Sequence, residues 1–308
     1  PPPPPPPPPT HSNFRRQRQM CIRDSAHPEA KKKKLALDAT YQQIATYFRL
    51  AAERPAPVIE ALLLNNNPRS TSACVDHLRT VGETTTFVSR ASDLDGTHPF
   101  TETGFEIWGP EEDTSIYYGR FRPMGLGAAG AVADTADGEL EQTGEPLPVP
   151  PAGVDAGAFY DLVERRRRGI FDNLLKIDKA SNNTSLVMLL EWRGWRLLFP
   201  GDAETRSWNE MHKRDLLAPV HFLKVGHHGS HNGTPTGDLL ERLLPTTPAD
   251  DRTRSALIST HEGTYNNVPD AHTMHELTSR CDVIERIGEA DDDLFVDLFF
   301  PDVTTSNP

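Results

Sequence analysis

Two short stretches decide the fold: WRLLFPGDAE at residues 195–204 and FLKVGHHGS at residues 222–230. In each of them, an apolar run typical of a strand ends at a glycine, and polar side chains that can bind a cation follow. The segment between the two stretches has the composition of an outer helix. We therefore expect two strands whose ends present Asp202 on one and His227 with His228 on the other.

The chain around these stretches alternates short apolar runs with tight turns. The predicted strand over 195–199 follows another over 185–192 after the turn Arg193-Gly194, which indicates a β-hairpin. This texture is typical of an α/β protein in which helices cover sheets. The other predicted elements are helices over 29–53, 70–81, 158–176, 205–217, 237–244 and 271–280, strands over 84–89, 105–108, 220–225, 255–259 and 294–300, and a strand or helical turn over 58–64.

The polar residues at the two strand ends are donors that zinc, manganese or iron accept. A carboxylate oxygen and imidazole nitrogens suit zinc first, and the adjacent glycines allow the tight backbone that turns both donors inward. Taken singly, each motif has a plainer interpretation. A Gly-Asp pair after a strand is most often a turn, and a His-His pair is most often a surface or capping feature. Their combination is what favours a metal site.

Together, the hairpin, Gly-Asp-Ala-Glu, the outer helix and Leu-Lys-Val-Gly-His-His-Gly-Ser resemble the second half of metallo-β-lactamase-fold proteins of the ComEC-like, competence-type branch. The Asn/Ser-rich stretch 182–187 also resembles the entry to the hairpin in that branch. The resemblance covers residues 180–290 well, and residues 58–120 only in their pattern of strands and turns. It implies a four-layer αββα sandwich that lacks part of its N-terminal half.

The resemblance also implies roles for individual residues. In the family, the aspartate after the hairpin commonly bridges two metals, so Asp202 takes that role, and the Gly-His-His-Gly turn completes the second metal with His227 or His228. The implied catalytic residues are Asp202 and His228, and the implied metal ligands are Asp202, His227 and His228. Two zinc ions are expected in a full-length family member, with manganese or iron as alternatives, whereas this fragment is expected to bind metal weakly and to hydrolyse little or nothing. Ser230 is expected to cap the next helix or to donate to the substrate.

The sequence departs from the family at the first metal motif. His-x-His-x-Asp-His, or a close variant, occurs nowhere, and the nearest histidines, His77 and His98, are isolated. The family's third ligand, a histidine ahead of the hairpin, is matched at best by Asn182 or Asn183, which bind these metals poorly. The main metal-holding loop is therefore missing.

A second departure lies near the C-terminus, where related proteins often have a Gly-His-Pro turn and this chain has residues 265–269. His261 or His272 could move into that space, although surface or capping use is the commoner role. Two explanations fit the missing first motif: the chain is truncated at its N-terminus, or the metals were lost. Truncation is favoured because an inactive relative would have no selective reason to retain Asp202 beside an intact Gly-His-His-Gly-Ser turn. Residues 16–25, which resemble a translated sequencing adapter, are consistent with it.

Composition limits the function classes. The formal net charge of −12 does not favour nucleic-acid binding, unless a metal or the Arg165–Arg168 run reverses the field locally. Three scattered cysteines are too few for a disulfide framework or a cysteine-based zinc site. No apolar run reaches the roughly 20 residues that cross a bilayer, and no secretory leader is present. We therefore expect a soluble, cytoplasmic protein without a membrane segment.

The chain divides into four parts. Residues 1–25 form a disordered, non-native segment, and residues 26–123 are a remnant of the N-terminal half of the metallo-β-lactamase-like domain. Residues 124–158 form a Pro/Gly-rich insertion, and residues 159–308 are the C-terminal half of that domain. The predicted function is that of a metal-dependent hydrolase that acts on phosphoester or nucleic-acid-type substrates through a metal-activated water, and the expected partner is a small-molecule or phosphoester substrate. The alternatives are a non-catalytic interaction domain of the same fold, and a generic α/β protein whose motif residues serve as turns and caps.

Overall fold

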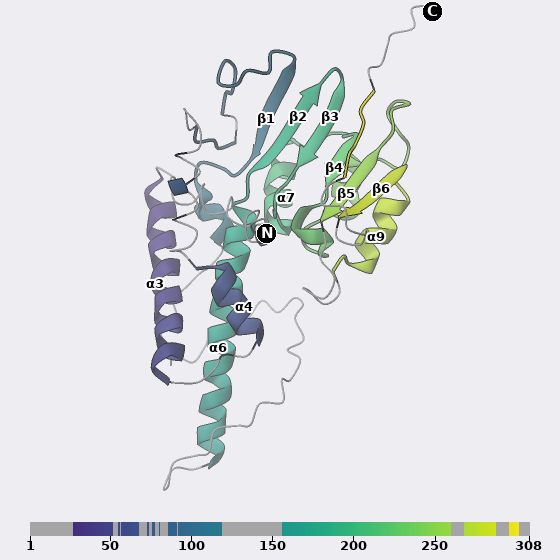
Figure 1. Cartoon of the computed structure of the whole chain (residues 1–308). Helices are drawn as coiled ribbons and strands as arrows, with labels where there is room; N and C mark the ends of the chain where they lie inside the picture. Colours follow the sequence, from purple (N-terminus) through teal and green to yellow (C-terminus); the bar gives the residue numbers. More distant parts are fainter. Residues whose placement is uncertain are drawn as a thin grey trace, which may run out of the picture.

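The computed structural model describes residues 27–51, 55, 57–67, 73, 76, 77, 80, 86–90, 92–118, 156–259, 268–287 and 296–301, with the backbone alone at 50, 51, 58, 65 and 156–168. Six strands of this part form one mixed sheet in the order β1-β2-β3-β4-β5-β6 (Figure 1). The strands are β1 (Thr103–Gly109), β2 (Val187–Trp192), β3 (Trp195–Phe199), β4 (Phe222–Lys224), β5 (Ser255–Ser259) and β6 (Val283–Ile287).

The sheet changes direction at β3. β1, β2 and β3 are antiparallel neighbours, whereas β3, β4, β5 and β6 are parallel. The β2–β3 hairpin closes at Arg193 and Gly194, whose φ angles are 48° and 80°. Positive φ at both central residues is what a tight two-residue hairpin turn requires. The helices α7 (Thr205–Lys213), α8 (Asp238–Leu243) and α9 (Ala271–Thr278) connect the parallel strands.

The two faces of the sheet are covered differently. Leu198, Leu223 and Ile258 point to one face, where they pack in the main core with side chains of α7, α8 and α9. The alternate residues form what we name the aromatic face, which has Trp195, Leu197 and Phe222 at its centre. Residues 296–301 lie on that face, and Trp195 Nε1 donates to the carbonyl of Pro301 at 3.0 Å (Figure 1). Period-two alternation therefore gives every central strand two apolar faces.

Three long or mid-length helices form a second core beside the sheet. They are α3 (Pro28–Ala51), α4 (Pro57–Asn65) and α6 (Ala156–Asn183), and η1 (Thr114–Tyr118) packs against them. Ile44 of α3 and Leu174 of α6 are almost completely buried between these helices. The C-terminal end of α6 leads directly into β2, so this helix connects the helical core to the sheet (Figure 1).

The predicted elements agree with most of these bounds. The hairpin, β1, β4, β5 and the helices α3, α6, α7, α8 and α9 are confirmed as elements, and residues 58–64 are helical. Two predicted strands are wrong where the structure describes them. Residues 86–89 and 296–300 form no strand: the first closes a turn through Ser89 N and Ser92 Oγ, and the second packs on the aromatic face. β6 was not predicted, because Glu285 and Arg286 interrupt its apolar pattern.

The fold class is mixed α/β, as predicted. Where the sequence predicts the two sheets of a sandwich, the described residues contain a single six-stranded sheet. Residues 1–25 and most of the predicted insertion over 124–158 lie outside the described part, and α6 already begins at Ala156. Within the described residues, none of the helices has both the length and the apolar character needed to span a bilayer.

Candidate functional site

The two motif turns lie next to each other at the carboxyl ends of β3 and β4. These strands pair in parallel, so the chain leaves both of them at the same edge of the sheet. Close backbone packing joins the turns: a Cβ added to Gly226 would lie 3.2 Å from the carbonyl oxygen of Gly201 and 3.0 Å from that of Gly233. Gly226 is therefore required by space, because any side chain there would separate the two turns.

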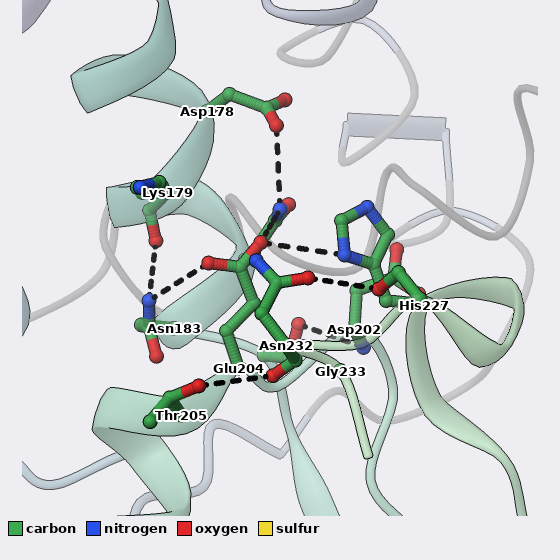
Figure 2. Close-up of polar contacts among 12 residues, drawn as sticks. Asp178, Lys179, Asn183, Asp202, Glu204, Thr205, His227, Asn232 and Gly233 are labelled. Carbon is green, nitrogen blue, oxygen red and sulfur yellow. Dashed lines mark hydrogen bonds and ion pairs between the residues drawn. The ribbon is translucent and has the colours of Figure 1, made fainter. Parts of the chain in front are cut away.

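Asp202 lies at the tip of the first turn. Its backbone N–H donates to Ser185 Oγ at 3.2 Å, and its side chain is half-buried. Gly201 before it has a φ of 59°, and a Cβ there would lie 3.0 Å from Ser185 Cβ. The left-handed conformation and the close approach both explain the glycine, and together they fix the direction in which the aspartate leaves the sheet. Figure 2 shows Asp202 on the same loop as Glu204 and next to the turn that carries His227.

Glu204 is the centre of a buried polar network that the sequence did not reveal. Only 4% of this residue is exposed. Asn182 Nδ2 donates to Oε1 at 2.5 Å, and Asn183 Nδ2 donates to Oε2 at 3.4 Å (Figure 2). Although Glu204 is the N-cap residue of α7, its side chain makes no capping bond and turns towards α6. A buried carboxylate needs such donors, because an unsatisfied charge in the interior is costly.

Asn182 and Asn183 occupy the position at which the family resemblance predicts a metal-binding histidine. In the structure they form the last turn of α6, and their amides hold Glu204. The oxygen Oδ1 of Asn183 is also used within the chain, since it accepts the backbone N–H of Ser207 at 2.9 Å. These two residues therefore position the Gly201-Asp202 turn from the α6 side, through their bonds to Glu204.

The His-His pair is held in an unusual backbone conformation. His227 and His228 have φ angles of 46° and 57°, which side-chain-bearing residues rarely adopt. Two consecutive residues of this kind persist only where their surroundings enforce the conformation, and such strain is concentrated at functional sites. The turn packs closely against Gly233: a Cβ added there would lie 2.6 Å from His227 Cβ, so only glycine leaves room for this histidine. The turn thus projects two imidazoles in different directions.

The imidazole of His228 has a defined tautomer. Its Nδ1 lies 2.6 Å from the carbonyl oxygen of Ser259, the last residue of β5. Because a carbonyl can only accept, Nδ1 carries the proton, and in the neutral ring the lone pair lies on Nε2. Histidine ligands of metals are commonly oriented in this way by a backbone carbonyl.

His227 faces the other direction, towards the buried carboxylate. Its Nδ1 lies 3.3 Å from Glu204 Oε1, although the geometry is not that of a hydrogen bond (Figure 2). The ring centroids of His227 and His228 are 6.3 Å apart. The two histidines therefore have different partners: Glu204 for His227 and the Ser259 carbonyl for His228. The sequence alone does not show which histidine has which partner.

The donors that are present do not complete a metal site. Oxygen and imidazole donors are the right kinds for zinc, and protein zinc sites use at least three of them. Among the residues that the structure describes, no three His, Cys, Asp or Glu side chains converge closely enough to hold a metal ion. Asp202, His227 and His228 lie on adjacent turns but do not form such a group. The described donors therefore have the right chemistry for zinc but do not form a complete zinc site.

The remaining predicted candidates are His98, His272 and Ser230, together with residues that lie outside the described part. His98 packs against Phe105, with ring centroids 4.5 Å apart, and His272 is exposed on α9. Ser230 donates to Asn232 Oδ1 at 2.9 Å instead of capping α8, whose N-cap residue is Gly237. His261, residues 265–267 and the side chains of Arg165–Arg168 are outside the described part.

Glu204 and the pair formed by Lys224 and Ser259 were not predicted from the sequence. Lys224 Nζ donates to Ser259 Oγ at 2.9 Å, at the same edge of the sheet. Glu204 stands two residues after Asp202, so a polar residue directly behind a strand-end motif was the available signal. In a comparison with known proteins, no family model, curated protein or solved structure matches this chain.

Proposed function

We propose that this chain belongs to a metal-dependent hydrolase of the metallo-β-lactamase superfamily and carries one part of its active site. The observation that supports this is the side-by-side position of the Gly201-Asp202 and Gly226–Gly229 turns at the carboxyl edge of β3 and β4. Open α/β sheets bind ligands at this edge. On this proposal the sheet is one half of an αββα sandwich, α7, α8 and α9 are its outer layer, and the aromatic face meets the second sheet.

Within this proposal, Asp202 and His228 are the ligands that the described residues contribute. His228 is favoured over His227 because the Ser259 carbonyl holds its Nδ1 in hydrogen-bond geometry, which directs the Nε2 lone pair outward. Asn182 and Asn183 hold Glu204 by hydrogen bonds to its carboxylate, and Glu204 in turn positions the Gly201-Asp202 turn. It faces His227, which suits a proton-accepting or orienting role for that pair.

The proposed substrates are phosphoesters, including nucleic-acid-type phosphodiesters. In hydrolases of this class a divalent metal lowers the pKa of a bound water and so supplies the nucleophile. The described donors alone do not close a site for that metal. A non-catalytic interaction domain is the second candidate, and the lack of three converging donors among the described residues favours it.

Zinc binding by the metal-stripped chain tests the proposal. Two donors hold zinc weakly, so we expect about one ion per chain, bound with a Kd of about 10 μM or weaker and lost on dialysis. A titration against a zinc indicator dye, with parallel measurement of bis(4-nitrophenyl) phosphate hydrolysis, gives both readouts. We expect Asp202→Asn and His228→Ala to reduce zinc affinity about tenfold or more, and phosphodiester turnover by this chain alone to be negligible.

Matched controls are available on the same molecule. Asp215 has a side chain that is 90% exposed and a φ of 55°, a conformation that asparagine accepts, so Asp215→Asn should leave zinc affinity unchanged. His275→Ala, at an exposed position of α9, serves in the same way for His228. Equal affinity in all four variants would refute the proposed ligands, and no measurable binding would support the interaction domain. An in-frame His-x-(His/Asp)-x-Asp-His motif upstream of codon 26 would independently support the hydrolase.

A further inference from the structure

Lys224 is a cation without an anionic partner inside the described part of the protein. It is the last residue of β4, and its side chain leaves the sheet on the aromatic face, the same side as Phe222. Its Nζ donates to two neutral oxygens, Ser259 Oγ at 2.9 Å and the carbonyl of Val225 at 3.2 Å. Within the described residues, no carboxylate lies within ion-pair distance of it.

Such an arrangement is costly in an apolar setting. Burial lowers the pKa of Lys224 from 10.5 to about 8, and no neighbouring carboxylate counteracts it. Charged side chains that are withdrawn from water are normally paired. A lysine that needed only to fill space on this face could be a leucine or methionine without that penalty. The charge therefore calls for an explanation other than packing.

The hydrogen bonds around Lys224 leave donors for one more acceptor. An ammonium group has three N–H donors, and the two neutral oxygens use two of them. The Ser259 hydroxyl accepts from Lys224 through its oxygen, so its own proton is available to a further acceptor. Two donors, one of them charged, thus converge from adjacent parallel strands.

We propose that Lys224 Nζ and Ser259 Oγ form an anion subsite that binds an oxygen of a phosphate group. The subsite lies at the edge of the sheet that carries the motif turns, because Ser259 also accepts the Nδ1 proton of His228 through its carbonyl. Ser259 thus contacts Lys224 through its hydroxyl and His228 through its carbonyl, so an anion bound by Lys224 and Ser259 would lie on the same side of the site as that imidazole. The choice of phosphate over carboxylate rests on the proposed function, whereas the anion subsite itself does not depend on a metal.

The position explains why the anion would need this lysine. The chain has a formal net charge of −12, so its overall field repels anions. A local, partly desolvated cation at the strand ends offsets that repulsion at short range, where charge-assisted hydrogen bonds are strongest. A serine–lysine pair can also act as a nucleophile and its base, in which case a fluorophosphonate would label Ser259.

Phosphate binding by the whole chain in the presence of a chelator tests the subsite. Isothermal titration calorimetry with inorganic phosphate in EDTA-containing buffer excludes any contribution of a metal. We expect Lys224→Met to weaken phosphate binding by about tenfold or more and Ser259→Ala by a smaller factor. Lys213→Met is the matched control, because Lys213 lies exposed on α7 beside Glu210. Acetate in place of phosphate tests the carboxylate arm, and we expect it to bind more weakly.

A second measurement on the unaltered protein covers the case in which a variant fails to fold. Reductive methylation followed by mass spectrometry reports the reactivity of each lysine, and phosphate should protect Lys224 but not Lys213. Phosphate affinity that is unchanged in Lys224→Met, or methylation of Lys224 that phosphate does not slow, overturns the proposal. Labelling of Ser259 by a fluorophosphonate would also overturn it, in favour of the nucleophile. Because no metal is present, these results are separate from those of the zinc titration.

Discussion

At the scale of single residues, Lys224 should make the free energy of unfolding depend on pH. Its pKa in the folded chain is about 8, whereas the unfolded chain keeps the ordinary value of 10.5. Between these two pH values the unfolded state binds more protons, so the free energy of unfolding rises with pH across this window. Below pH 8 Lys224 is protonated in both states, and the buried charge then lowers the free energy of unfolding by at most about 3 kcal/mol.

Lys224→Met should therefore be more stable than the parent chain at pH 7, by about 1–3 kcal/mol, and the difference should vanish near pH 10.5. Urea unfolding at pH 7, 9 and 10.5 in phosphate-free buffer measures it. The difference between the two proteins is the relevant quantity, because burial raises the pKa of Cys281 and of Tyr117 to about 12, which lowers the stability of both proteins at high pH. A difference that is constant with pH would contradict the assignment to Lys224.

The candidate site also shows, residue by residue, what the sequence could and could not predict. The positions of Asp202 and His228 behind two strand ends were predictable, because each follows an apolar strand and a glycine, which is a local pattern. Glu204 was not, since its nearest donor, Asn182, lies 22 residues away in the chain and is brought to it by the end of α6. The pairing of Lys224 with Ser259 bridges 35 residues for the same reason. Contacts between elements are what local spacing leaves out.

At the scale of elements, the two turns are held together by the absence of a side chain at Gly226. An added methyl group would meet two backbone carbonyls that cannot move independently of the turns. Gly226→Ala should lower the free energy of unfolding by about 1–3 kcal/mol. Gly169→Ala is the matched control: Gly169 lies within α6 with nothing within 4 Å of its added Cβ, so alanine should stabilise the chain by about 0.5–1 kcal/mol. Urea unfolding that gave both variants the same sign would contradict this account.

Element bounds were predictable where a local signal ended them. The turn Arg193-Gly194 defines the hairpin, and the glycine after β4 ends that strand, so both lie close to their predicted positions. The C-terminal end of α6 was placed too early, at residue 176, because the asparagines that follow are poor helix formers. In the structure they continue the helix, since their side chains bond to Glu204 and so stabilise the last turn. Tertiary contacts thus outweigh propensity there.

At the scale of the whole molecule, the α/β class was predictable from the alternation of apolar strands and amphipathic helices. The arrangement of layers was not. Strands with two apolar faces indicate that both faces of the sheet are covered, but they do not indicate whether helices, a second sheet or a loop covers each face. In the described part, helices cover one face and residues 296–301 lie on the other, where the Phe300 ring is 5.2 Å from that of Trp195. A second sheet on that face is part of the proposed function and is not among the described residues.

The helical core and the sheet should unfold together, because α6 belongs to both. Leu174 of α6 is completely buried among the helices, while the end of the same helix holds Glu204 beside the motif turns. Leu174→Ala should cost about 2–5 kcal/mol. All four tryptophans lie on β1, β2, β3 and α7, so their fluorescence reports the sheet, whereas circular dichroism at 222 nm is dominated by the long helices.

We expect the two signals to shift to the same lower urea concentration in Leu174→Ala, as they would in a single cooperative transition. Leu35→Ala, on the exposed side of α3 where 69% of the residue is accessible, should leave both midpoints almost unchanged. A variant in which the dichroism midpoint falls while the fluorescence midpoint stays would show that the helices unfold separately. The contact between α6 and Glu204 would then be too weak to couple the helical core to the candidate site.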